Sequence, residues 1–67
     1  MTARERIVEY LRGLGGVRAT TRQIAQTLML PEPSVRRELG ELEARRGVVP
    51  SFENGDPRTY WSVIVVS

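Results

Sequence analysis

The sequence contains no cysteine and no histidine, and all ten of its basic residues are arginine. Without cysteine, neither a disulfide nor a thiolate metal site can stabilise so short a chain. Without histidine, the commonest general base and a frequent zinc ligand are missing. These absences indicate no catalytic residue, no metal site and no cofactor, so we expect a protein that is not an enzyme.

Long hydrophobic runs are also missing. The apolar tail, residues 63–66, is the length of a strand and far short of the ~20 residues that a membrane-spanning helix needs. The beginning of the chain, "MTARERIVEYL", lacks the apolar region of a signal peptide. We therefore expect an intracellular protein without a membrane partner, located in the cytoplasm or nucleoid, or in the nucleus of a eukaryotic host.

The chain has 67 residues and a formal net charge of +2, and we expect a single domain over residues 1–67. The basic balance permits nucleic acid as a partner but does not require it. Arginine suits such a partner, because its planar guanidinium donates paired hydrogen bonds to phosphate or guanine.

The beginning of the chain predicts a helix over about residues 3–13. Thr2 and Glu5 have the spacing of a capping box, and apolar residues then recur at helical intervals. Glycines end this helix, and residues 17–19 after them are long enough only for a short strand.

Two further helices are predicted on either side of a tight turn. Thr20 and Gln23 repeat the capping-box spacing at the start of a helix over about residues 21–28. A third helix is expected over about residues 32–46, with prolines in its first turn and Gly47 at its end.

The last third of the chain predicts a β-hairpin. Residues 48–52 and 59–66 have the composition of strands, and Asn54-Gly55 between them is a strong hairpin signal. Three helices followed by a hairpin indicate a mainly α fold with a small antiparallel sheet. This is the arrangement of a winged helix-turn-helix domain, in which the hairpin over about residues 48–66 is the wing.

The pattern of residue types along the chain also resembles that of known winged helix-turn-helix proteins. The segment "ATTRQIAQTLMLPEPSVRRELGELEARRGVV" resembles the three-helix core and first wing strand of small winged helix-turn-helix regulators of the MarR and ArsR type. The resemblance covers nearly the whole chain. It implies a DNA-binding protein in which the third helix reads the duplex.

A narrower resemblance is to Z-alpha domains, the winged helices that bind left-handed duplexes. It is carried by "ERIVEYLRGLGG", "ATTRQIAQTL", "SVRRELGEL" and "YWSVIVVS". That family usually has an asparagine and, four residues later, a tyrosine on the third helix, where this sequence has Arg36 and Gly40. It also has a proline pair just before a wing tryptophan, where this sequence has Pro57 and Trp61 in "DPRTYW".

The third helix supplies the main candidate residues for DNA binding. In a helix-turn-helix domain the N-terminal half of this helix enters the major groove. We expect Arg36 and Arg37 to contact DNA there, one reading guanine and the other binding phosphate, with Ser34 on the same face. Gly40 either lets DNA or the wing approach the helix backbone or serves internal packing.

The charge of this helix favours a different interpretation. Residues 31–47 contain four arginines and four glutamates, so the segment is neutral overall. Glu32 and Arg36, like Glu41 and Arg45, are spaced for i,i+4 ion pairs. A solvated helix that only covers the core therefore remains an alternative.

The remaining candidate residues lie at the start of the second helix and in the wing. The free N–H groups at a helix start can bind phosphate, and a cation at a wing tip can enter the minor groove or follow the backbone. Ordinary helix capping and a polar hairpin end are the alternatives. The candidates are Thr20, Thr21, Arg22, Asn54, Arg58 and Thr59.

The final strand carries two expectations. Trp61 alternates with Val63 and Val65, so we expect it to pack on the core, with a phosphate bond from its indole N–H as the alternative. The apolar residues 63–66 could pair with a second copy of the chain and form a homodimer.

Three functions are compatible with these patterns. The leading one is binding of double-stranded DNA by the third helix and the wing, as in a small transcriptional regulator. The first alternative is a winged helix used for protein–protein contact, which the neutral third helix and apolar last strand favour. The second is a divergent domain that binds Z-form nucleic acid.

Overall fold

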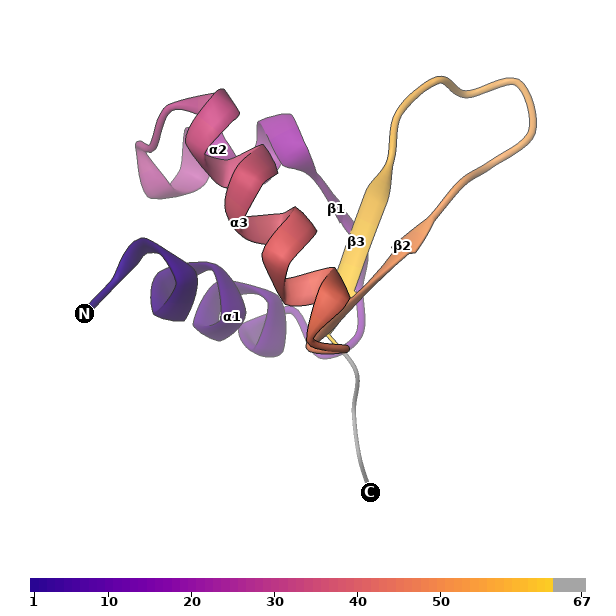
Figure 1. Ribbon diagram of the computed structural model, residues 1–67. Coiled ribbons are helices and arrows are strands. Elements are labelled where there is room, and N and C mark those ends of the chain that lie inside the picture. Colours follow the sequence, from indigo (N-terminus) through magenta and orange to yellow (C-terminus); the bar gives the residue numbers. More distant parts are fainter. Residues whose placement is uncertain (64–67) are drawn as a thin grey trace.

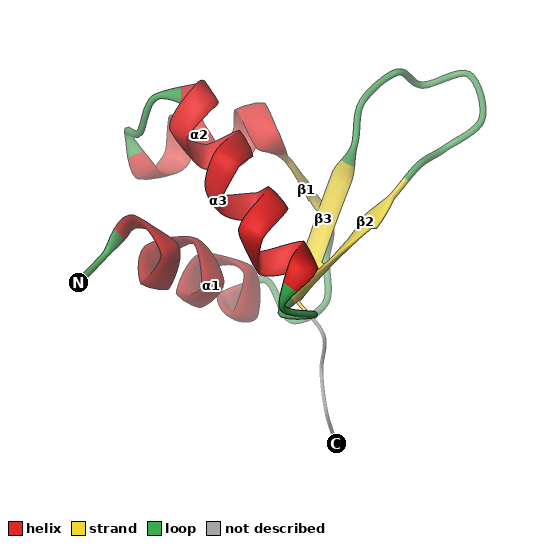
Figure 2. Ribbon diagram, viewed as in Figure 1, coloured by secondary structure: helices red, strands yellow, loops and turns green. Residues whose placement is uncertain are grey.

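The computed structural model describes residues 1–63 and confirms a winged helix-turn-helix fold (Figure 1). Three helices pack against one side of a small antiparallel sheet, whose strand order is β1-β3-β2 (Figure 2). The elements in chain order are α1 (Ala3–Gly13), β1 (Ala19–Thr20), α2 (Thr21–Leu28), α3 (Glu32–Ala44), β2 (Val48–Ser51) and β3 (Tyr60–Val63). Within the described part of the chain, no helix is long and apolar enough to cross a membrane.

The core lies between the three helices and the inner face of the sheet. Each helix contributes apolar residues at helical spacing, which places them on one face. The sheet contributes its inward-facing residues, including the aromatic ring of Trp61. The buried residues are Ile7, Leu11, Ala19, Ile24, Ala25, Val35, Leu39, Leu42, Val48 and Trp61.

Threonine side chains cap the first two helices, as the sequence predicts. At α1 the Thr2 hydroxyl accepts the N–H of Glu5, and the Glu5 carboxylate bonds back to Thr2, which completes the capping box. At α2 the Thr20 hydroxyl accepts the N–H of Gln23 at 3.0 Å. These bonds satisfy N–H groups that have no partner within their helix.

Helix α3 ends at Ala44, two residues earlier than the sequence predicts. Arg46 adopts a left-handed conformation with φ of 59°, which a continuing helix does not allow. The N–H groups of Arg46 and Gly47 then bond to the carbonyls of Glu43 and Leu42, at 2.9 and 2.8 Å. This is a Schellman motif with an arginine where glycine is usual.

The end of helix α2 repeats this geometry with a methionine. Met29 has φ of 57°, and its N–H bonds to the carbonyl of Gln26 at 3.3 Å. The next N–H, that of Leu30, bonds to the carbonyl of Ala25 at 2.9 Å. The left-handed residue makes the turn that leads into α3 tight.

The wing has shorter strands and a longer loop than the sequence predicts. Strand β2 ends at Ser51 and β3 begins at Tyr60, so residues 52–59 form the loop. A turn forms at Asn54-Gly55, but only Gly55 has positive φ, so the two-residue type I′ hairpin is not adopted. The loop extends well away from the helices (Figure 1).

Strand β3, where the sequence places a homodimer contact, lies between two other strands of the sheet. Strand β1 is Ala19–Thr20, rather than the predicted 17–19, and it pairs with one side of β3. Strand β2 pairs with the other side, where Val63 lies opposite Val48. The described part of β3 is therefore a central strand, and residues 64–66 of the predicted dimer contact lie outside the described residues.

Candidate nucleic-acid interface

A polar groove of about 650 Å³ lies between the start of α2, the start of α3 and the returning arm of the wing. It is formed by three segments that are far apart in the sequence and that the helix-turn-helix and the hairpin bring together. Its lining residues are Thr20, Thr21, Arg22, Gln23, Gln26, Glu32, Arg36, Pro57, Arg58, Thr59 and Tyr60.

The groove brings together most of the residues that the sequence singles out. Six predicted residues line the groove. They come from the start of α2, from α3 and from the wing: Thr20, Thr21, Arg22, Arg36, Arg58 and Thr59. Ser34, Arg37 and Gly40 are instead exposed on α3, and Asn54 is exposed at the tip of the wing. The predicted set thus divides into a groove and an adjoining exposed surface.

Two threonine hydroxyls in the groove already serve as hydrogen-bond acceptors. The Thr20 oxygen accepts the backbone N–H of Gln23, and the Thr21 oxygen accepts the indole N–H of Trp61, both at 3.0 Å. A hydroxyl has a single proton, and neither N–H can accept it. Each threonine therefore keeps its own proton to donate to a ligand in the groove.

Trp61 belongs to the core, as the alternation of the strand predicts. Its side chain is 8% exposed, and its position opposite Ala19 and Pro50 places it on the inner face of the sheet. The indole N–H is used by Thr21, which leaves it unavailable for a direct bond to phosphate. Trp61 therefore acts on the groove by holding the Thr21 hydroxyl in place.

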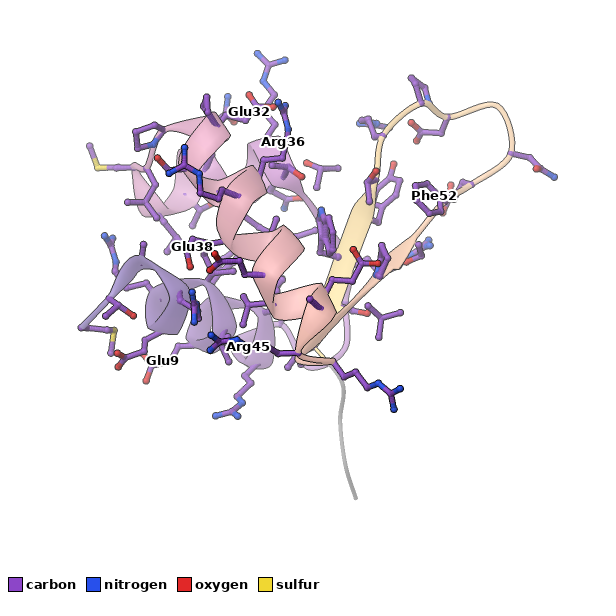
Figure 3. All side chains as sticks on the ribbon, in the orientation of Figure 1. Glu9, Glu32, Arg36, Glu38, Arg45 and Phe52 are labelled. Carbon is purple, nitrogen blue, oxygen red and sulfur yellow. The ribbon has the colours of Figure 1, made fainter. Side chains whose placement is uncertain are left out.

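The two groove arginines that come from the helices, Arg22 and Arg36, are held loosely. Arg36 forms the predicted i,i+4 ion pair with Glu32 at 3.2 Å, and the two side chains project together at the start of α3 (Figure 3). The Arg36 side chain is 68% exposed, so the pair contributes at most a few tenths of a kcal/mol and can be exchanged for another anion. Among residues 1–63, Arg22 and Arg37 have no ion-pair partner.

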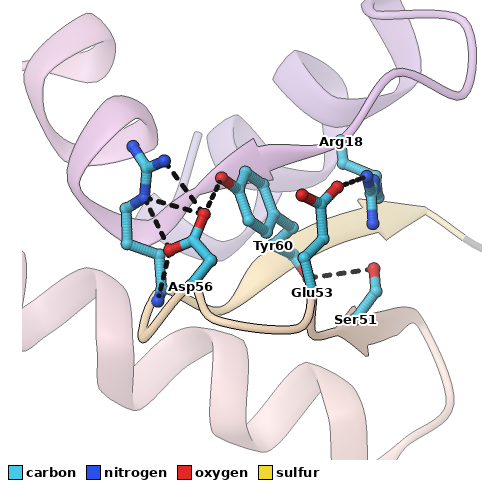
Figure 4. Close-up of polar contacts among 6 residues, drawn as sticks. Arg18, Ser51, Glu53, Asp56 and Tyr60 are labelled. Carbon is cyan, nitrogen blue, oxygen red and sulfur yellow. Dashed lines mark hydrogen bonds and ion pairs between the residues drawn. The ribbon is translucent and has the colours of Figure 1, made fainter.

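In the wing, Asp56 organises the side chains that face the groove (Figure 4). The Arg58 guanidinium donates to both carboxylate oxygens, with Nε to Oδ1 at 3.0 Å and a terminal nitrogen to Oδ2 at 2.9 Å. The Tyr60 hydroxyl donates to Oδ2 at 2.6 Å. Arg58 and Arg18 both lie against the Tyr60 ring, 5.5 and 5.1 Å from its centroid.

These bonds change the proton affinities of the wing. Hydrogen bonds from Arg58 and then from Tyr60 hold the pKa of the Asp56 carboxyl well below its usual range. The same bond to Asp56 raises the pKa of the Tyr60 hydroxyl, because ionisation would remove its proton. The charge of Arg58, which the sequence predicts as a free cation, is therefore shared with a carboxylate.

Two carboxylates of α3 are paired with an arginine of α1. Arg4 of α1 donates to Glu38 at 2.9 Å and also pairs with Glu41. The predicted pair of Glu41 with Arg45 is wrong, because Glu41 turns toward α1 instead. Helix spacing alone could not reveal this partner, which lies 37 residues away in the chain.

Gly40 lies one turn after Arg36 on the exposed side of α3. A Cβ built on Gly40 would meet no atom within 4 Å, so the packing alternative for this glycine is wrong. The helix presents bare backbone there, and a larger side chain would fit.

Several residues of the groove were missed from the sequence. Gln23 and Gln26 lie on the polar side of α2, which the three-residue spacing after Thr20 could have identified. Tyr60 could not have been found in this way, because its role depends on the path of the wing loop, which brings Asp56 within hydrogen-bonding distance of its hydroxyl.

Comparison with known proteins places the chain in a family. No protein-family model and no curated protein matches the sequence. The Z-alpha domain of zebrafish PKZ, solved in its apo form, is 32% identical with a TM-score of 0.83, over 92% of this chain and 91% of that one.

Two further solved structures are also similar to this chain. A PKZ Z-alpha domain in complex with ds(CG)6 is 34% identical with a TM-score of 0.78, over 88% of this chain and 89% of that one. The Z-alpha domain of Carassius auratus PKZ, in complex with Z-DNA, is 23% identical with a TM-score of 0.77, over 91% and 90% of the two chains. Given the 32% and 34% matches over nearly the full length of both partners, this chain belongs to the Z-alpha family of winged helix-turn-helix domains.

Proposed function

We propose that this domain binds a nucleic-acid duplex through the groove and the exposed face of α3. The carrying observation is the pair of free hydroxyl protons on Thr20 and Thr21 beside the arginines of the groove. Hydroxyl, guanidinium and helix-start N–H groups are the donors that proteins use for phosphate oxygens. Arg37, the α3 arginine outside the groove, would extend this contact along the duplex.

We propose further that the preferred duplex is left-handed DNA. The support comes from the relatives, since one PKZ Z-alpha domain was solved with ds(CG)6 and another with Z-DNA. Gly40 lacks the aromatic side chain that Z-alpha domains usually have at this position. Recognition by this domain would therefore depend more on phosphate contacts than on a base contact from α3, and its affinity should respond strongly to salt.

The experiment combines circular dichroism with fluorescence anisotropy. An alternating CG duplex is titrated with the wild-type domain, and inversion of the spectrum at saturation is expected if the left-handed form is bound. Anisotropy of the same labelled duplex at several salt concentrations compares wild type with Arg36→Ala/Arg37→Ala. Removing two phosphate contacts should make the negative slope of log affinity against log salt shallower by about 1.8.

Gly40→Tyr serves as the matched gain-of-function variant. The space around Gly40 accepts a side chain, and tyrosine restores the residue that the family usually carries. If the domain binds left-handed DNA in the manner of its family, this variant should invert the spectrum at a lower protein concentration than wild type does. An unchanged titration would show that the helix does not face the duplex at this point.

A second candidate is sequence-selective binding of right-handed DNA, as in a small transcriptional regulator. It is favoured by Arg36, since an arginine on a recognition helix can donate two hydrogen bonds to guanine, for about 1–3 kcal/mol of discrimination. Salt-dependent binding to mixed-sequence duplex without spectral inversion would support this candidate. No binding of wild type at low salt would exclude both, and would favour the protein–protein alternative.

A further inference from the structure

The Asp56 carboxylate in the wing loop lies among hydrogen-bond donors from two residues, Arg58 and Tyr60 (Figure 4). The backbone N–H of Arg58 donates to Oδ1 at 2.9 Å, in addition to the bonds from its guanidinium. The Tyr60 hydroxyl donates to Oδ2, the oxygen that also accepts the terminal guanidinium nitrogen. A backbone amide, a guanidinium and a hydroxyl are the donors that proteins use to bind phosphate. These donors therefore form an anion site, and a carboxylate of the same loop occupies it.

The donors of this site also face the groove. Arg58 and Tyr60 line the groove, whereas Asp56 is not among its lining residues. In the sheet, Tyr60 lies directly opposite Thr20. Side chains of directly opposite residues share one face of a sheet, so Tyr60 lies on the same face as the Thr20 hydroxyl. An anion that enters the groove beside Thr20 would thus meet the wing at Tyr60 and compete with Asp56 for the same donors.

The occupant of the site is held less firmly than the Tyr60 donor. Asp56 lies in the loop between Ser51 and Tyr60, where the wing has no strand pairing, and its N–H bonds to the carbonyl of Glu53 in the same loop. Tyr60 belongs to the central strand β3, and its ring lies against Arg18, which pairs with Glu53. Asp56 can therefore leave by a movement of the loop alone, while the Tyr60 hydroxyl stays in place.

We propose that Arg58 and Tyr60 form a binding site for one backbone phosphate of the duplex, and that Asp56 occupies this site as an internal competitor in the free domain. This inference rests on the proposed function, because the phosphate belongs to the bound duplex, and it makes Tyr60 a phosphate ligand. A phosphodiester and a carboxylate each carry one negative charge, so the exchange replaces one anion by another. The wing contact of the wild-type domain is then weakened by the fraction of molecules in which Asp56 closes the site.

The first experiment uses inorganic phosphate and needs no duplex. Phosphate is titrated at constant ionic strength into wild type, Asp56→Ala and Asp56→Ala/Tyr60→Phe, and the NMR signals of the Arg58 backbone N–H and Nε–H report binding. Asp56→Ala should bind phosphate at least about tenfold more tightly than wild type, because its site is always open. Tyr60→Phe keeps the ring but removes the hydroxyl, so it should reverse part of that gain. Absence of saturable binding to Asp56→Ala would overturn the inference. The indole N–H signal of Trp61 verifies that each variant keeps its fold.

The second experiment separates the site from a general effect of charge, by anisotropy of the labelled alternating CG duplex. Glu53→Ala is the matched control, because it removes a carboxylate of the same loop whose partner, Arg18, does not line the groove. Asp56→Ala should tighten duplex binding by about tenfold, and Glu53→Ala by much less. Equal gains from the two variants would overturn the inference while leaving duplex binding intact. Absence of duplex binding by wild type would instead overturn the proposed function, and the phosphate titration would still decide whether the anion site exists.

Discussion

The indole N–H of Trp61 donates to the hydroxyl of Thr21 at 3.0 Å, which joins the core of the domain to its groove. The tryptophan lies on the central strand β3 and the threonine is the first residue of α2. The bond fixes the spacing between the wing and α2, and it also decides which way the Thr21 proton can point. Stability and the proposed duplex binding therefore share one hydrogen bond.

Thr21→Val should weaken both folding and duplex binding. Valine keeps the shape of the side chain but removes the acceptor for a nearly buried N–H, which should cost about 1–3 kcal/mol of stability. Losing the free hydroxyl proton should also weaken duplex binding by about tenfold or more, since a hydrogen bond to a charged group contributes about 1.5–3 kcal/mol. Denaturant unfolding and anisotropy measure the two effects.

The control for this variant is Trp61→Phe, alone and combined with Thr21→Val. Trp61→Phe removes the donor but leaves the hydroxyl, so its affinity for duplex should fall less than that of Thr21→Val. The two changes should be less than additive in stability, because they remove the same bond. Additive losses would show that the bond contributes nothing.

Asp56→Asn should strengthen the response of binding to salt. The carboxylate now shares the charge of Arg58, which is the cation of the wing that lines the groove. Without it, Arg58 is free to bind phosphate, and the slope of log affinity against log salt should become steeper by about 0.9. Arg58→Ala in the same background should return the slope to its original value. An unchanged slope in Asp56→Asn would mean that Arg58 does not reach the duplex.

Acid should loosen the wing only at a pH well below the ordinary pKa of an aspartate. Hydrogen bonds from Arg58 and Tyr60 depress the pKa of Asp56 below its ordinary value of 3.8. The stabilisation from a depressed carboxyl is complete above that value and is lost as the pH falls through the lower, folded-state pKa. NMR signals of the Tyr60 ring and the Arg58 Nε–H should therefore stay constant through the ordinary aspartate range and change only well below pH 3.8, and Asp56→Asn should abolish that dependence.

Met29→Gly should stabilise the domain. Met29 has a left-handed backbone and its side chain is 90% exposed, so glycine relieves the strain without removing any packing. We expect a gain of about 0.5–1 kcal/mol in the free energy of unfolding, part of the left-handed penalty being offset by the greater freedom of glycine in the unfolded chain. Met29→Ala keeps the Cβ and should give no such gain. Equal stability of the two variants in urea would contradict this account.

The sequence predicted the helices well because their signals are local. Capping threonines and apolar spacing gave the bounds of α1 and α2 to the residue, and the end of α3 was misplaced only because Arg46 takes a conformation usually reserved for glycine. The wing was less predictable, since its path depends on bonds such as that between Asp56 and Tyr60.

In the candidate site, too, the residues with local sequence signals were predicted, and the contacts between distant residues were not. Thr20 and Thr21 were identified through helix capping, and Arg36 through its place on α3, and all three line the groove. The sequence could not show that Trp61 engages Thr21, because 40 residues separate them.

The contacts of Arg4 with Glu38 and Glu41 bear on the charge that α3 presents to a partner. By composition the segment over residues 31–47 has as many glutamates as arginines, which does not favour binding to a polyanion. The fold adds a charge that the segment lacks: Arg4 of α1 pairs with Glu38 and Glu41, while Arg36 and Arg37 are exposed. The cation from α1 thereby makes the surface around α3 less negative than the composition of the helix alone suggests. An approaching phosphate backbone responds to that local field and not to the sum of charges along the chain.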